Sequence, residues 1–239
     1  MNNFILLFKG EMLRLVKYKI LQISFAVTVL WVLVIYLIGQ ENAANFIPVF
    51  IFMDAALMTV LLVGASLFYE RQENTLKTLM ITPSGYHAIL SSKITSAIYL
   101  ALQSTVLIAL FSTIVFDVSI KLIVLFSFIA LIALVHTAIG YTFTIFSRDF
   151  NGLIASVGGY MIVFAMPSIL SSFGIIPKAW DFILLISPTH VSLKMIDYSF
   201  NADVPLWTII GGTVYLVGLT VGLLKFVVAP KYAEMAVRE

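Results

Sequence analysis

Long apolar runs constrain this chain more than any other feature of its sequence. A helix needs about 20 mostly apolar residues to cross the hydrocarbon core of a bilayer, and six stretches meet that requirement. They cover residues 20–39, 46–69, 94–116, 120–146, 152–173 and 206–228. Only 11% of the 239 residues are charged, whereas a soluble domain carries about 25%. We therefore predict an all-α integral membrane fold with six transmembrane helices, in one domain over residues 1–239.

The first apolar run is predicted to be a retained membrane anchor. The apolar part of a cleaved signal peptide is about 7–15 residues long, and residues 20–39 form a longer run. This run also follows a basic segment that contains Lys9, Arg14, Lys17 and Lys19. Both features favour a first transmembrane helix over a signal peptide.

The distribution of Lys and Arg predicts the orientation, because the cytoplasmic flanks of spans carry an excess of these residues. With both termini inside, all but three of the 14 basic residues lie on the inner side. The exceptions are Lys121, Lys178 and Lys194. The outer loops also carry the acidic residues Glu41, Asp117, Asp181, Asp197 and Asp203. An N-in, C-in topology with an even number of spans follows.

Residues 2–18 are predicted to form an amphipathic helix in the plane of the inner headgroup layer. One side is polar, with Glu11 beside Asn3, Gly10, Arg14 and Lys17. The other side is apolar and carries Phe4, Ile5, Phe8, Met12, Leu15 and Val16. This pattern is typical of helices at a membrane interface. The alternative is a basic tail that only fixes the topology.

The longest inner connection, residues 70–93, is predicted to begin with a short surface helix. Over residues 70–80, charged and apolar positions recur at helical spacing, and Glu73 and Lys77 are spaced for an i, i+4 ion pair. Three apolar residues can share one face of this helix: Leu76, Leu79 and Met80. The Thr-Pro-Ser-Gly stretch at 82–85 then ends it. A soluble partner could bind this apolar face; the alternative is an ordinary solvated loop.

The outer connection, residues 174–205, is too short for a separate domain but is still fairly apolar. We expect it to return partly into the membrane, or to pack across the helix ends, as short re-entrant helices. Non-helical backbone at that depth must be shielded by protein or water. Pro188, followed by Thr189, marks the turn between two short pieces.

The chain carries no signature of catalysis or of nucleotide binding. The phosphate-binding loop G-x-x-x-x-G-K-[ST], the zinc motif H-E-x-x-H and the nucleophile elbow G-x-S-x-G are absent. There is no Cys, and the three His residues are far apart in sequence. No catalytic, cofactor-binding or metal-binding residue is therefore assigned. A net charge of +2 gives no electrostatic basis for a nucleic-acid partner.

Four polar residues inside the predicted spans are candidates for a transport path. Asp54 lies about 12 Å along the second span, where a charged Asp costs about 2.5–3.5 kcal/mol. It either lines a path or makes a structural hydrogen bond to another helix, and both interpretations stay open. His136 has the same ambiguity, with a packed neutral ring favoured. Gln103 and Tyr141 belong to small polar stripes, which are mostly packing faces in membranes but could line a path for an amphiphile.

Small residues gather on the fifth and sixth spans. Gly152, Ser156 and Gly159 lie near the start of the fifth, and the sixth contains a Gly218-x-x-x-Gly222 motif. Small residues let helix backbones approach closely. We predict that these residues pack against another helix, within this chain or in a dimer.

Two stretches match the pattern of a known family. After the second span the chain reads Glu70-Arg71-Gln72-Glu73-Asn74-Thr75-Leu76-Lys77-Thr78-Leu79, then Thr82-Pro83 and later Lys93. Before the last span it reads Ser187-Pro188-Thr189-His190. With these stretches the sequence resembles the permeases of the ABC-2 type transporter superfamily, the type V exporter fold. Asn74 stands where that family usually has Gly, and Lys77 where Glu is frequent.

This resemblance implies a permease that acts as a dimer with an identical or paralogous copy. Each half would be served by a separate ABC ATPase subunit, which binds ATP and Mg²⁺, so that this chain is not itself an enzyme. The resemblance also implies a coupling helix seated in a groove of the ATPase, with the first and fifth spans at the dimer contact. The coupling residues would be Glu70, Arg71, Glu73, Thr75, Leu76, Leu79 and Met80.

The function predicted is export of an amphiphilic substrate across a bacterial cell membrane. A drug, a lipid-like molecule or an amphipathic peptide or toxin would move outward from the cytoplasm or the inner leaflet. An ion- or proton-coupled secondary transporter that uses Asp54 is the alternative, and the absence of clear inverted repeats argues against it. A polytopic membrane enzyme is disfavoured by the missing catalytic signatures.

Overall fold

Six helices of the computed structural model are long and apolar enough to cross a membrane, within the residues that it describes, 3–75, 86–201 and 203–231. Their number confirms the expectation from hydropathy. They run Ile20–Ile38, Ala43–Gln72, His87–Phe116, Leu122–Phe146, Phe150–Ser172 and Leu206–Lys231. The second and third reach further toward the 70–93 segment than predicted, because helical backbone continues beyond the apolar run at both places.

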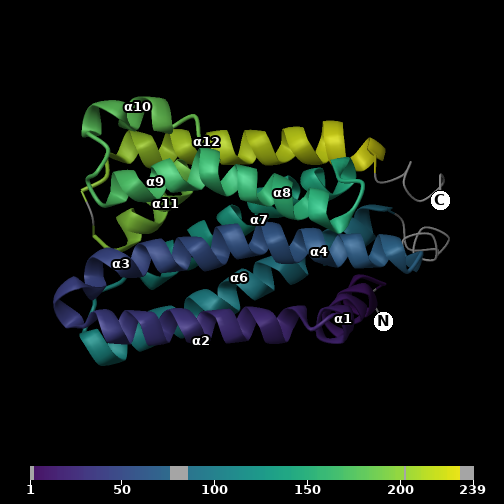
Figure 1. Ribbon diagram of the computed structural model, residues 1–239, viewed down its shortest axis with the longest axis horizontal. Helices are drawn as coiled ribbons and strands as arrows, with labels where there is room; N and C mark the ends of the chain where they lie inside the picture. Colours follow the sequence, from purple (N-terminus) through teal and green to yellow (C-terminus); the bar gives the residue numbers. More distant parts are fainter. Residues whose placement is uncertain (1–2, 76–85, 202, 232–239) are drawn as a thin grey trace.

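Figure 1 shows these spans side by side along the long axis of the molecule. Three of them are single helices: α2 (Ile20–Ile38), α6 (Tyr86–Phe116) and α7 (Leu122–Phe146). The others contain π-helical turns. The second span joins α3 (Gln40–Phe52), η1 (Met53–Met58) and α4 (Thr59–Gln72). The fifth joins α8 (Phe150–Tyr160), η2 (Met161–Ala165) and α9 (Met166–Ser172), and the sixth joins α12 (Leu206–Leu223) and η4 (Leu224–Val228).

The second span is the most enclosed of the six. Its side chains Ile47, Phe52 and Val60 are fully buried, and they belong to the same apolar cluster as Ile129 and Ile132 of α7. The span contacts α2, α6, α7, α8 and α11. It therefore forms the centre around which the other helices pack.

Two glycines let α4 and α7 cross closely. A Cβ added to Gly140 would lie 2.7 Å from the carbonyl oxygen of Val60, and one added to Gly64 would lie 3.2 Å from Thr144 Oγ1. Thr144 Oγ1 donates to the Gly64 carbonyl oxygen at 3.1 Å. The small polar residues of α7 thus form a packing face against the central span, as such residues commonly do in membranes.

The N-terminal helix α1 (Asn3–Lys17) lies across one end of the bundle, seen nearly end-on in Figure 1. Lys19 takes the left-handed backbone conformation, with φ 62°, where the chain turns from α1 into α2. Glu11 of α1 is buried against the bundle, whereas Ile5 and Leu13 are exposed. Lys93 of α6, whose Nζ lies 3.0 Å from Glu11 Oε1, accounts for the inward position of Glu11.

Residues 174–201 fold over the opposite end of the bundle, around α10 and α11 in Figure 1. They contain η3 (Lys178–Trp180), α10 (Asp181–Leu184) and α11 (Pro188–Ser199). Most side chains of α11 are buried, because this helix packs among α3, α7, α9 and α12. The apolar residues of α11 therefore fill space between helix ends, whereas Phe182 and Ile186 before it are exposed.

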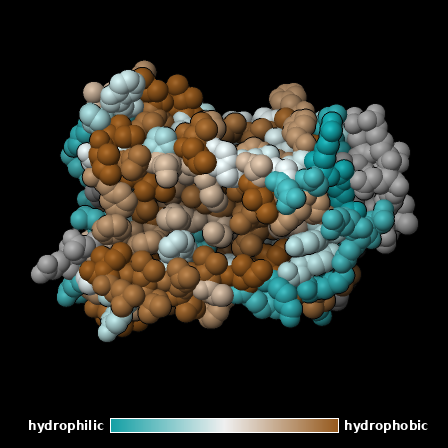
Figure 2. Space-filling model, in the orientation of Figure 1, coloured by the Kyte–Doolittle hydropathy of each residue, from teal (hydrophilic) through white to brown (hydrophobic). Residues whose placement is uncertain are grey.

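The sides of the bundle expose large apolar side chains. Leu33, Ile114, Ile123 and Val214 are each more than half exposed. Figure 2 shows hydrophobic residues over the middle of one face and hydrophilic residues gathered at the end that carries α1. An exposed apolar surface of this extent is suited to lipid rather than to water. The chain is therefore a multi-pass membrane protein.

Candidate functional site

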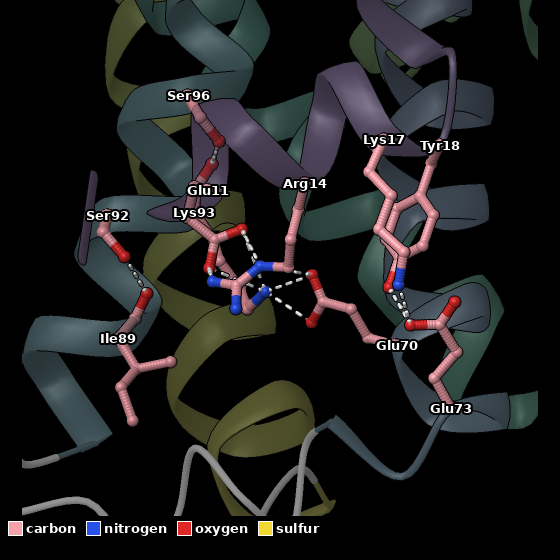
Figure 3. A network of polar contacts seen from close by, with 10 residues as sticks. All are labelled: Glu11, Arg14, Lys17, Tyr18, Glu70, Glu73, Ile89, Ser92, Lys93 and Ser96. Atoms are coloured by element: carbon pink, nitrogen blue, oxygen red, sulfur yellow. Dashed lines mark hydrogen bonds and ion pairs between the residues drawn. The ribbon is translucent and has the colours of Figure 1, made fainter. Parts of the chain in front are cut away.

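Four charged side chains meet at the end of the bundle from which the 70–93 segment departs. Glu11 and Arg14 come from α1, Glu70 from the end of α4, and Lys93 from the beginning of α6. We call these four residues the charge network. Figure 3 shows their side chains pointing toward one another from three different helices.

Lys93 lies at the centre of the charge network. Its Nζ donates to Glu70 Oε1 at 2.6 Å and lies 3.0 Å from Glu11 Oε1. Arg14 pairs with Glu11 on the same helix, and its Nε lies 3.7 Å from Glu70 Oε1. Each carboxylate therefore faces both bases, and opposite charges alternate around the network.

The charge network is shielded from its surroundings. Glu11, Glu70 and Lys93 are 2%, 0% and 4% exposed, and the Arg14 side chain is 16% exposed. Removing an ion from water costs several kcal/mol, which close pairing has to offset. In the charge network, the attraction between two acids and two bases offsets this cost of removing the charges from water. Loss of one member would leave a buried charge without compensation.

The serines beside Lys93 do not compete for the carboxylates. Ser92 Oγ donates to the carbonyl oxygen of Ile89 at 2.8 Å, and Ser96 Oγ donates to that of Lys93 at 2.7 Å. Hydroxyls bound to their own helix in this way are satisfied locally. The Glu11 and Glu70 carboxylates are thus left to the basic side chains.

Glu73, the first residue beyond α4, makes a second set of polar contacts, which is exposed. Glu73 accepts hydrogen bonds from Lys17 Nζ at 2.7 Å and from the Tyr18 hydroxyl at 2.9 Å. These two bonds lower the pKa of Glu73. Burial, with the bond to Glu73, raises the pKa of Tyr18 to about 12. The Tyr18 ring also packs on Tyr69, with ring centroids 5.4 Å apart. The end of α1 therefore binds the start of the 70–93 segment.

On another side of α4, Arg71 reaches the junction between α7 and α8. Its Nη1 donates to the carbonyl oxygen of Ser147 at 3.1 Å. Asp149 caps α8 there by accepting from the Gly152 backbone N–H at 2.7 Å. A surface hollow of about 650 Å³ adjoins this junction. It is lined by Phe68, Arg71, Gln72, Asn74, Arg148, Asp149, Phe150 and Asn151.

The residues predicted to couple to an ATPase have different environments. Glu70 is buried in the charge network, Arg71 and Thr75 are half-buried, and Glu73 is exposed. The other three lie outside the described residues: Leu76, Leu79 and Met80. Among the predicted coupling residues that the structure describes, Glu70 contacts α1 and Lys93, and Glu73 contacts α1.

Two of the path candidates make hydrogen bonds inside the bundle. Asp54, in η1, accepts from Thr28 Oγ1 of α2 at 2.7 Å. His136 Nδ1 lies 2.8 Å from the carbonyl oxygen of Ile132, to which it must donate, and Nε2 lies 3.2 Å from the Tyr160 hydroxyl. These hydrogen bonds are what a structural role of Asp54 and His136 requires. A role of either residue in transport stays a prediction.

The other two path candidates lie elsewhere. Gln103 is half-buried on α6. Tyr141 is 3% exposed on α7 and lines a small pocket together with Glu11 and Lys93. The structure therefore brings Tyr141 next to the charge network, which its place in a polar stripe does not indicate.

Three of the predicted small residues of the fifth and sixth spans are not used for close packing within the described part of the chain. A Cβ added to Gly159, Gly218 or Gly222 would meet nothing within 4 Å. Ser156 Oγ donates to the carbonyl oxygen of Gly152 in its own helix at 2.9 Å. These faces are open to another chain, and their role in a dimer stays a prediction.

The turn at Pro188 joins the segment before the last span to the fifth span. Pro188 is the first residue of α11, a position that needs no backbone N–H. The buried Thr189 donates to the carbonyl oxygen of Phe164 at 2.6 Å, and its Oγ1 lies 3.0 Å from Ser168 Oγ. The family-like stretch 187–190 thus fixes α11 against η2 and α9.

Sequence reasoning did not find the charge network as a unit. Its contacts join positions as far as 82 residues apart, as in the bond between Lys93 and Glu11. A usable signal does exist, because Glu70 and Lys93 are charged residues that border two apolar runs at the same end of the bundle. A charge at such a position needs a partner or water.

In the ranges 3–75, 86–201 and 203–231, no group of three or more His, Asp or Glu could hold a metal ion. Comparison of the chain with protein-family models, with curated proteins and with solved structures found no match.

Proposed function

We propose that this chain is the permease subunit of an ATP-driven exporter of the ABC-2 type. In this proposal a soluble ABC ATPase binds the 70–93 segment and moves it as nucleotide is bound and hydrolysed. The observation that carries the proposal is the charge network, because it joins both flanks of that segment to each other and to α1.

The charge network suits the transmission of force. Glu70 before the segment and Lys93 after it share a hydrogen bond of 2.6 Å, and both lie against residues of α1. A push on the segment would therefore move α4, α6 and α1 together. A solvated loop without such ties would absorb the same displacement by bending.

The surface around the charge network suits a folded partner. The hollow of about 650 Å³ lies beside Arg71, and the exposed pair of Lys17 and Glu73 lies at the start of the segment. Protein interfaces combine a buried centre with a polar rim. The hollow would be the centre of the ATPase contact, and the exposed pair would belong to its rim.

The rest of the assembly follows from the family resemblance. Two permease copies and two ATPase subunits would make one exporter in the bacterial cell membrane, with ATP and Mg²⁺ bound by the ATPase. The open glycine faces at Gly159, Gly218 and Gly222 are available to the second permease. The substrate would be an amphiphile such as a drug, a lipid-like molecule or an amphipathic peptide, carried outward.

The test is co-purification of ATP hydrolysis with the permease. The tagged chain is isolated from its own membranes, and ATPase activity is measured per mole of permease. Joint substitution Leu76→Asp and Leu79→Asp should lower the bound activity at least ten-fold while the unfolding temperature of the permease stays the same. Ile175→Asp, an exposed apolar position at the opposite end, should leave it unchanged. Bound activity that survives the double substitution contradicts the proposal.

A further inference from the structure

Two hollows adjoin each other at the end of the bundle opposite the charge network. One has a volume of about 370 Å³ and lies between α10, α11 and the start of α12; we call it the polar hollow. The other, of about 380 Å³, continues along α12, and we call it the apolar groove. Both are lined by the same four residues where they meet: Phe182, Leu185, Trp207 and Thr208.

The polar hollow contains charges of both signs. Asp181 Oδ2 accepts from Lys194 Nζ at 3.1 Å inside it. Lys178 and Asp203 also line it and are exposed. With two carboxylates and two ammonium groups, the hollow is balanced overall and suits neither a simple anion nor a simple cation.

His190 lies at the base of the polar hollow without a hydrogen bond. Its residue is 1% exposed, and neither ring nitrogen has a hydrogen-bond partner among the described residues. The nearest carboxylate oxygen, Asp181 Oδ1, is 3.7 Å from Nε2. Burial, with a contribution from Lys194, lowers the pKa of His190 to about 4. The neutral ring therefore offers one N–H and one lone pair, and leaving a buried polar group unpaired is unfavourable.

The apolar groove has the space that a hydrocarbon chain requires. Its lining is almost entirely apolar, and two glycines, Gly211 and Gly212, form part of its wall. A Cβ added to Gly211 would meet nothing within 4 Å. The hydroxyl of Tyr215, which also lines it, is already bonded to the carbonyl oxygen of Ile186 at 2.6 Å. The Tyr215 hydroxyl is therefore satisfied, and it does not disfavour an apolar ligand in the groove.

We propose that the polar hollow and the apolar groove form one binding site for a membrane amphiphile with a zwitterionic head, a phosphate ester joined to a primary ammonium. The head occupies the polar hollow and one acyl chain lies in the apolar groove. This site goes beyond the exporter proposal, because it requires neither an ATPase nor transport.

The charges of the polar hollow match each part of such a head. Lys178 and the N–H of His190 suit the phosphate oxygens, since both can donate to them. Asp203 suits the ammonium group, which needs an acceptor. Trp207, 63% exposed where the two hollows meet, is an aromatic residue of the kind enriched at the boundary between headgroups and acyl chains.

The test uses native mass spectrometry of the purified full-length chain released from detergent. Phosphatidylethanolamine and phosphatidylglycerol with identical acyl chains are added in equal amounts. The proposal predicts that the first is retained at least five-fold more than the second. Equal retention of the two lipids overturns it. Free phosphoethanolamine is a third arm, and binding of this head alone as tightly as the lipid overturns the part assigned to the apolar groove.

Substitutions assign the binding to this site. Gly211→Leu fills the apolar groove and should lower retention of phosphatidylethanolamine at least five-fold. Val214→Phe is the control, because Val214 lies exposed on the same helix and does not line either hollow, and this variant should retain the lipid. His190→Phe keeps a ring but removes both nitrogens, and it should reduce the preference between the two lipids at least five-fold. Wild-type retention by Gly211→Leu, or an unchanged preference in His190→Phe, contradicts the proposal.

Discussion

Buried charges are the residues that most shape this molecule. Lys93 faces Glu70 and Glu11 in an environment where each is less than 5% exposed, so their contribution depends on staying together. By contrast Lys17 and Glu73, paired at 2.7 Å, have side chains 61% and 43% exposed. Exposed pairs contribute about 0–1 kcal/mol, whereas breaking a buried pair costs about 3–5 kcal/mol.

The two pairs allow a matched comparison. Lys93→Gln leaves two carboxylates without their central base, and we expect it to lower the free energy of unfolding by about 3–5 kcal/mol. Lys17→Gln, made at the exposed pair, should lower it by no more than about 1 kcal/mol. Unfolding of both variants by denaturant in the same detergent measures the difference. Equal losses would mean that the charge network does not stabilise the fold.

Asp54 separates the two transport mechanisms. Asp54→Asn keeps an acceptor for Thr28 Oγ1, now 2.7 Å from the carboxylate, but removes the ionisable group. For an ATP-driven exporter we expect transport within about two-fold of the wild type, because the hydrogen bond of about 1 kcal/mol is retained. Transport is measured as substrate efflux from cells, with Thr28→Val as the variant that breaks the bond. Complete loss of transport in Asp54→Asn with normal folding would favour the proton-coupled alternative.

At the scale of elements, the helices differ in how well their sequences predict them. The pattern of α1 predicts a helix, but the residues that face the bundle are set by partners on α4 and α6. Glu11 is buried where it meets Lys93 of α6, while Leu13 is 62% exposed. Helical periodicity reports which residues share a side. It does not report which side meets charged groups that are distant in sequence.

Helix α11 carries two groups whose effects on stability depend on pH in opposite directions. Burial raises the pKa of Asp197 from 3.8 to about 6, and burial lowers the pKa of His190 from 6.5 to about 4. The folded chain therefore prefers protonated Asp197 and neutral His190. As pH falls from 7 toward 4, the cost of ionised Asp197 disappears, whereas a cost of keeping His190 neutral arises.

Single substitutions separate these two effects. Asp197→Asn removes the penalty of the largely enclosed carboxylate, so it should raise the free energy of unfolding more at pH 7.5 than at pH 5, by a difference on the order of 1–3 kcal/mol. His190→Phe should show the opposite dependence: it should raise the free energy of unfolding more at pH 5 than at pH 7.5. Thermal unfolding in detergent at the two pH values measures both. A gain from Asp197→Asn that is the same at both pH values would contradict the burial of its charge.

At the scale of the whole molecule, the count of spans is the part of the fold that sequence predicts best. Continuous apolar runs are required by lipid itself, because a span has no water to satisfy polar side chains. The candidate site is predicted less well. The family-like stretch marks Glu70 and the residues after it, but the tie to α1 depends on tertiary contacts, such as the 3.0 Å contact between Lys93 and Glu11.

The proposed binding of a cytoplasmic ATPase requires the 70–93 segment to lie on the cytoplasmic side of the membrane. The chain contains no Cys, so a single introduced Cys reports one position without background. We compare Gly85→Cys with Ile175→Cys, which lies at the opposite end of the bundle and is 66% exposed in the wild type. In intact cells a membrane-impermeant maleimide should label position 175 but reach position 85 only after permeabilisation. Labelling of position 85 from outside intact cells would contradict the account, because no cytoplasmic ATPase could then bind this segment.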